Sequence, residues 1–145
     1  MALHLIKLCV GADCVEDLAT WQRDRLAEAR REKRPVELWH RTRMFPKRRD
    51  EVLDGGSLYW VIKGIVLVRQ QIKDLRAATC QDGITRCDIV LGSELVPVRP
   101  VPRRAFQGWR YLPADEAPAD LKAGEAKLAG LPAKMRADLV ALGLI

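Results

Sequence analysis

The spacing of apolar and polar residues predicts a strand followed by a helix at the start of the chain. Residues 1–10 are mostly apolar, lack a basic stretch before the apolar run and are too short to span a bilayer, so we expect a strand rather than a signal or membrane segment. Asp13 and Glu16 stand three residues apart, which is the spacing of a capping box. A helix is therefore expected to begin there and to end before Pro35.

This helix has apolar side chains at roughly helical intervals and arginines and acids on its other side. Trp21 falls on the apolar side, so we expect it to anchor the helix in the core rather than to contact a ligand. The apolar positions are Val15, Leu18, Trp21, Leu26 and Ala29.

The middle of the chain predicts a series of strands. Residues 36–45 form a strand with a basic outward face, and residues 47–54 form a short helical turn before the glycines at 55 and 56. Residues 57–63 and 65–72 alternate in the manner of two consecutive strands, and Gly64 between them indicates a bend or bulge.

Further along, Asp82-Gly83 predicts a hairpin that joins residues 72–80 to residues 84–91. Residues 94–104 contain three prolines, which suit an edge strand or an extended surface segment but not a central strand. A last helix is expected from Pro132 to Gly143. The pattern thus predicts a single α+β domain over residues 1–145, with a core in about residues 1–112 and an Ala/Pro-rich segment and helix in 113–145.

Composition agrees with a folded domain, since 48% of the residues are hydrophobic and 30% are charged. We expect a cytoplasmic chain whose four cysteines are free thiols, because no export signal is recognised. The cysteine spacings do not match a structural zinc site, and no phosphate-binding or dinucleotide-binding fingerprint is present. No metal and no cofactor are therefore expected, and His4 and His40 are interpreted as structural.

Charge changes this picture most. The net charge is +6, yet residues 39–49 contribute +5 and residues 96–112 contribute +4 without a single acidic residue in either segment. Such basic segments attract polyanions, because the neutralised phosphates release their counterions. The alternative is a solvated surface that only favours solubility.

Aromatic residues lie among these cations, which is the composition expected of a surface for single-stranded nucleic acid. We predict RNA as the favoured partner and Tyr59 and Trp109 as the stacking rings. The predicted nucleic-acid-binding residues are Arg41, Arg43, Lys47, Arg48, Arg49, Tyr59, Lys63, Arg103, Arg104, Trp109 and Arg110.

Two stretches carry a family resemblance. Residues 43–64 (RMFPKRRDEVLDGGSLYWVIKG) and residues 102–112 (PRRAFQGWRYL) resemble an alphaproteobacterial family of unknown function over essentially the whole chain. The order of elements is more distantly similar to PUA-like domains of the ASCH and EVE branches. That resemblance implies a small curled β-barrel with an N-terminal helix and C-terminal helices, associated with RNA or modified bases. A Gly-Asp turn is common there, whereas this chain has Asp54-Gly55-Gly56-Ser57.

Two other function classes stay open at this level. A small ASCH-like hydrolase or nuclease would use residues that follow the predicted basic strand as acid or base, provided that their surroundings tune their pKa values. A protein-interaction module would pair its arginines with an acidic partner. Whether the chain is an enzyme is thus undecided, and the hydrolase candidates are Lys47, Glu51, Asp54 and Lys63.

Overall fold

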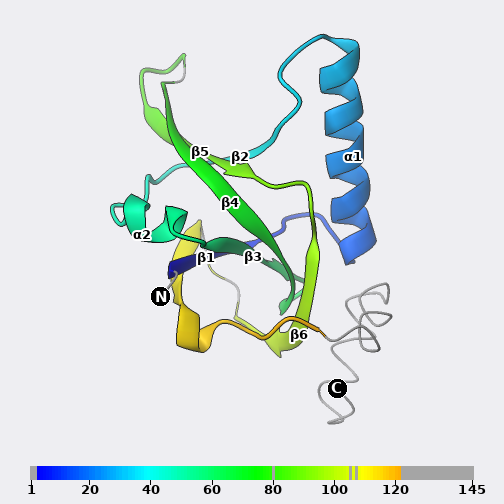
Figure 1. Ribbon diagram of the computed structural model, residues 1–145, viewed down its shortest axis with the longest axis vertical. Helices are drawn as coiled ribbons and strands as arrows, with labels where there is room; N and C mark the ends of the chain where they lie inside the picture. The colour runs from blue at the N-terminus through cyan, green and yellow to red at the C-terminus, as the bar shows by residue number, and fades with distance from the viewer. Residues whose placement is uncertain (1–2, 80, 105, 107, 122–145) are drawn as a thin grey trace.

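The computed structural model describes residues 3–79, 81–104, 106 and 108–121. These residues form a mixed α+β fold with two helices and one seven-stranded sheet, which confirms the predicted fold class at that level (Figure 1). The predicted helix over residues 132–143 lies outside the described residues. The elements are β1 (Leu3–Leu8), α1 (Val15–Arg31), β2 (Leu38–Thr42), α2 (Arg49–Leu53), β3 (Ser57–Ile62), β4 (Ile65–Thr79), β5 (Thr85–Leu91), β6 (Val96–Pro102), β7 (Trp109–Pro113) and a short 3-10 turn (Ala114–Glu116).

The sheet is organised around the long strand β4. Its order is β2-β5-β4-β3-β1-β7, and β6 also pairs with β4. The first part of β4 pairs with β3 and β6, and the part from Ile72 onward pairs with β5. β1 and β3 run parallel and the other pairs are antiparallel. The described strands do not close into a ring, so β2 and β7 remain the two ends of the sheet.

Two hydrophobic clusters cover the two faces of the sheet. The larger one gathers Leu5, Leu58, Leu67 and Ile89, and the smaller one gathers Ile6, Tyr59 and Val66. β3 is buried along its whole length, because both clusters draw on its alternating side chains. This double burial explains why its sequence is apolar at consecutive positions.

The turn between β3 and β4 differs from the expected bend or bulge. Lys63 and Gly64 both have positive φ values, 51° and 81°, as in a tight two-residue hairpin turn that suits twisted strands. The register shifts lie elsewhere. One lies between Trp60 and Val61 in β3 and between Val66 and Val68 in the facing part of β4, and another lies between Ile72 and Asp74 in β4. The hairpin at Asp82-Gly83 and the edge strand β6 lie where the sequence predicts them.

Helix α1 stands beside the sheet and touches it with only part of its length (Figure 1). Val15, Leu18 and Ala29 are buried, but Trp21 is 45% exposed. The prediction that Trp21 anchors the core is therefore wrong. Its ring lies instead against Gly11, where an added Cβ would stand 3.5 Å from the edge of the indole.

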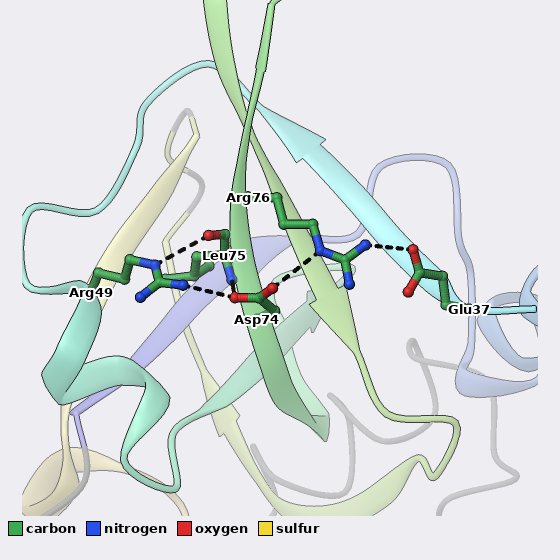
Figure 2. Close-up of polar contacts among 5 residues, drawn as sticks. All are labelled: Glu37, Arg49, Asp74, Leu75 and Arg76. Carbon is green, nitrogen blue, oxygen red and sulfur yellow. Dashed lines mark hydrogen bonds and ion pairs between the residues drawn. The ribbon is translucent and has the colours of Figure 1, made fainter. Parts of the chain in front are cut away.

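The bulge in β4 is fixed by a chain of charged groups (Figure 2). The Asp74 carboxylate accepts hydrogen bonds from Arg49 of α2 at 2.9 Å and from Arg76 at 3.1 Å. Arg76 in turn donates to Glu37 at 2.7 Å, and Arg49 also donates to the Leu75 carbonyl at 3.2 Å. The network thereby ties α2 and the start of β2 to the middle of β4.

We expect Asp74→Asn to lower the unfolding free energy at pH 7 by up to about 1 kcal/mol, because the pair lies near the surface and is screened by solvent. Hydrogen bonding to Arg76 holds the pKa of Asp74 below its usual value. The contribution is therefore present at neutral pH and is lost as the pH falls through that lowered pKa. Urea denaturation of both proteins at pH 7 and in acid measures it.

Asp50→Asn is the matched control, since Asp50 lies 3.9 Å from the same arginine but has a fully exposed side chain. It should leave the unfolding free energy unchanged. If Asp50→Asn lowers the unfolding free energy as much as Asp74→Asn does, the contribution of Asp74 comes from its net charge alone and not from its hydrogen bonds in the bulge.

Candidate nucleic-acid surface and tryptophan pocket

The two basic segments meet in the folded chain. The indole N–H of Trp109 in β7 donates to the Met44 carbonyl at 2.8 Å, and the Arg48 backbone N–H donates to the Tyr111 hydroxyl at 3.1 Å. The Arg48 guanidinium also lies 5.6 Å from the centre of the Tyr111 ring. These contacts join the chain after β2 to β7, although the two strands stand at opposite ends of the sheet order.

Several of the predicted binding residues have acidic partners within the fold. Arg41 forms two hydrogen bonds with Asp88, at 2.7 and 3.0 Å. Arg48 pairs with Glu51, and Arg49 pairs with Asp74. Lys63 lies 2.9 Å from Asp13. The acidic partners come from outside the two basic segments, so the positive charge counted along the sequence is partly neutralised in space.

Four predicted cations are exposed and form no ion pair with any residue that the structure describes. Arg43 and Lys47 follow β2, and Arg103 and Arg104 follow β6. Arg110, also exposed, has its guanidinium 5.6 Å from the centre of the Phe106 ring. Within the set of predicted binding residues, the charge that no described acidic residue pairs with thus lies in these two short connecting segments.

The two predicted stacking rings are engaged by the protein itself. Tyr59 is only 4% exposed and belongs to the smaller hydrophobic cluster, so a base cannot stack on it without displacing that packing. Trp109 is partly exposed, but its N–H is bonded to Met44 and its ring meets Tyr111 edge to face at 4.8 Å.

The candidate acid and base groups do not gather into one cluster. Hydrogen bonding to Arg48 lowers the pKa of Glu51, which makes this exposed carboxylate a poor proton donor at neutral pH. Lys63 is paired with Asp13. Among the described residues, no three His, Cys, Asp or Glu side chains are placed to hold a metal ion. Cys9, Cys14 and Cys87 are free thiols, and Cys80 lies outside the described residues.

A pocket that the sequence did not predict lies between α1 and the sheet. Its volume is about 250 Å³, and residues from the end of β1, from α1, from β2 and from β3 line it. Three of the four tryptophans of the chain are among them. The lining residues that matter below are Lys7, Cys9, Trp21, Gln22, Arg25, Trp39, His40 and Trp60.

Lys7 occupies a position of β1 that would normally face the core. Leu3 and Leu5, at alternate positions of the same strand, belong to the larger hydrophobic cluster. Lys7 stands opposite Trp60 of β3 on one side and Trp109 of β7 on the other, so these side chains share one face of the sheet. Through Trp109 the pocket adjoins the place where the two basic segments meet.

Gln70 of β4 holds the inner wall of the pocket. Its carbonyl oxygen accepts from the Trp60 indole at 2.9 Å and from Gln22 of α1 at 2.8 Å. Its amide nitrogen donates to Gln22 at 2.8 Å and to the Gly92 carbonyl at 2.9 Å. Gln70 is fully buried, and every hydrogen-bonding position of its amide is used. The Trp60 ring and helix α1 are thereby tied to the same buried group.

The electrostatics of the pocket follow from burial. Desolvation lowers the pKa of His40 to about 4, with smaller contributions from Lys7 and Arg25, and the His40 ring meets Trp60 edge to face at 5.3 Å. Desolvation raises the pKa of Cys9 to about 11. Both groups are consequently uncharged at neutral pH. Arg25 donates to the Trp39 carbonyl at 3.0 Å, and its guanidinium lies 6.0 Å from the centre of the Trp39 ring.

The sequence offered one signal for this pocket. Within the apolar run of β1, Lys7 is a charged residue in phase with Leu3 and Leu5. A lysine at such a position indicates either an irregular strand or an inward-facing cation. By contrast, no pattern in the sequence shows that Trp21, Trp39 and Trp60 converge, because they come from three different elements.

These features define a class: an α+β protein with an open mixed sheet, a tryptophan-lined pocket beside its helix and a basic surface next to that pocket. The chain belongs to the family described as a protein of unknown function, DUF1489, whose model matches residues 5–145. None of the curated proteins and none of the solved structures compared with the chain matches it. Within the described part, neither helix is long and apolar enough to cross a membrane.

Proposed function

We propose that the chain is a cytoplasmic protein that binds single-stranded nucleic acid, RNA in the first place, on the surface where its two basic segments meet. The contact between those segments, through Trp109 with Met44 and Tyr111 with Arg48, supports this proposal most strongly. If the segments lay on opposite sides, a solvated surface would be the better explanation of the charge.

The four cations that have no acidic partner among the described residues would supply the phosphate contacts. Arg43 and Lys47 come from one segment and Arg103 and Arg104 from the other, so a strand passing over the junction would meet charge from both. The distant resemblance to PUA-like barrels agrees with this proposal, and a curled sheet flanked by α1 is compatible with it. Arg41, Arg48 and Arg49 would act indirectly, by fixing the segments through their ion pairs.

Salt dependence tests this proposal. If the four cations neutralise four phosphates of a single strand, the logarithm of the binding constant should fall with the logarithm of salt with a slope of about −2.8. Binding to a short single-stranded RNA should then weaken about 50-fold between 50 and 200 mM salt. Filter binding at these two concentrations measures the effect.

A double variant, Arg43→Gln with Lys47→Gln, should reduce the slope to about −1.4, because two phosphate contacts are lost. Arg30→Gln with Arg31→Gln is the matched control, since it removes two exposed charges in the last turn of α1. If both double variants weaken RNA binding equally, the binding depends on net charge alone and not on these two residues. Absence of RNA binding at low salt, or capture of an acidic protein after nuclease treatment instead, would overturn the proposal.

A further inference from the structure

The pocket between α1 and the sheet has a surplus of positive charge that nothing in the described chain neutralises. Among the described residues that line the pocket, Lys7 and Arg25 are the only lysine and arginine and none is acidic, while His40 and Cys9 are uncharged at neutral pH. No ion pair of either cation occurs among the described residues. Lys7 is also half-buried, so solvent compensates its charge only in part.

The walls of the pocket favour a flat, apolar group. Trp60 is fixed in the wall by its bond to Gln70, and Trp21, which is 45% exposed, lines the same pocket. Covering a large aromatic side chain with a ligand ring removes apolar surface from water, which favours binding. Stacked aromatic rings also attract each other. Gly11 lies near the edge of the Trp21 indole, and 45% of the Trp21 surface is exposed, so part of this ring is available to a ligand.

The size of the pocket limits what it holds. Its volume of about 250 Å³ lies below the range of about 300–1,000 Å³ that is typical of pockets for drug-sized ligands. One ring system with one charged substituent is compatible with this volume, whereas a dinucleotide is too large.

We propose that this pocket is a binding site for a planar ring that carries a negative charge, stacked on Trp21 and paired with Lys7 and Arg25. The shared chemistry is an aromatic or heteroaromatic ring with an anionic group. Two sources supply it: the phosphate of a mononucleotide and the carboxylate of an aromatic acid. The site adjoins the proposed nucleic-acid surface but uses none of the four cations proposed to contact phosphates there, so it does not depend on that surface.

Isothermal titration calorimetry with small probes tests the proposal. The probes are 5′-AMP and 5′-CMP, the nucleosides adenosine and cytidine, indole-3-carboxylate, and inorganic phosphate. At least one charged ring should bind ten-fold or more tightly than its uncharged counterpart and than inorganic phosphate. Binding of the nucleotides identifies the phosphate source, and binding of the carboxylate alone identifies the aromatic acid. If no charged ring binds, or if nucleosides bind as well as nucleotides and the carboxylate does not bind, the proposal is wrong.

Variants separate the two parts of the recognition. Lys7→Gln should weaken binding of the charged ring at least ten-fold, whereas Lys7→Arg should retain most of it. Trp21→Ala should weaken all ring binding, and because Trp21 is 45% exposed and belongs to neither hydrophobic cluster, this variant should still fold. Lys33→Gln is the matched control, as it removes an exposed charge beyond the end of α1. Equal weakening by Lys33→Gln and Lys7→Gln would overturn the assignment.

The Arg43→Gln with Lys47→Gln variant distinguishes this site from the nucleic-acid surface. It should bind the charged ring as tightly as the original chain while it loses RNA affinity. Ring binding without any RNA binding would leave this inference standing and remove the proposed function. RNA binding without ring binding would leave the proposed function standing and would show that the inferred ring site is wrong.

Discussion

The Gly56→Ala variant should lose at least about 3 kcal/mol of unfolding free energy, because an added Cβ has no space. It would come closer than 3.0 Å to the carbonyl oxygens of Val52 in α2 and Leu3 in β1, a separation that real Cβ atoms essentially never show. Both neighbours are backbone atoms and cannot rotate away. Gly56 also donates to Val52 at 2.9 Å and accepts from Ile72 at 3.0 Å, so a shift would strain hydrogen bonds on both sides.

Urea denaturation at neutral pH measures this loss, with circular dichroism as the signal. Gly92→Ala is the matched control: its added Cβ would meet nothing nearer than the Lys73 side chain at 3.5 Å, which is ordinary contact, and its φ is not positive. We expect that control to change the unfolding free energy by less than about 1 kcal/mol. Similar losses in the two variants would contradict the close approach of α2 and β1 at Gly56.

The second large effect is a loss of stability between about pH 6.5 and pH 4, caused by His40. Burial lowers its pKa to about 4 in the folded chain, whereas an unfolded histidine has a pKa of about 6.5. As the pH falls through this window, the unfolded state takes up a proton that the folded state does not, so the unfolding free energy decreases. We expect His40 to account for about 1–2 kcal/mol, less than full linkage would give, since the ring is partly exposed.

His4 acts in the same direction. Desolvation and the nearby Arg69 lower its pKa, and its Nδ1 accepts a hydrogen bond from the Ser57 N–H at 2.9 Å, which protonation of that nitrogen would abolish. The two histidines are the only ones in the chain, so their ring protons give two distinct signals in a nuclear magnetic resonance titration. The signal of His40 should move only near pH 4.

Two variants assign the pH dependence. His40→Phe keeps a flat ring against Trp60 but cannot titrate, and it should flatten the change in unfolding free energy between pH 6.5 and pH 4. His4→Asn keeps an acceptor for Ser57, so it removes the titration of His4 with the least change to the backbone contact. A His40 signal that titrates near 6.5 in the folded protein would refute the burial argument.

Much of the secondary structure follows from local patterns. The strand β1, the limits of α1, the turn of α2 and the hairpin at Asp82-Gly83 lie close to where the sequence predicts them. These features depend on residues near one another in the chain, such as turn formers and alternating apolar side chains. Gly64 was misinterpreted because the residue before it, Lys63, also adopts a positive φ, which its side chain does not favour.

The candidate site was predicted less well, because charges pair through space. Arg41 and Asp88 are 47 positions apart and become partners only when β2 pairs with β5. The net charge counted over each segment of the sequence is therefore larger than the positive charge that the folded surface presents. Trp21 was misjudged for a related reason: helical spacing gives the side of a helix on which a residue lies, but not how much of that side the sheet covers.

By itself, the sequence determined the α+β class, the order of most elements and the two acid-free basic segments, since these are properties of composition and short-range spacing. Only the tertiary structure decided which cations have no acidic partner among the described residues, that the two basic segments touch, and that three tryptophans and Lys7 line one pocket. The physical reason is that β1, β2, β3 and α1 meet through long-range pairing and packing, and contacts between distant residues leave no periodic trace in a single chain.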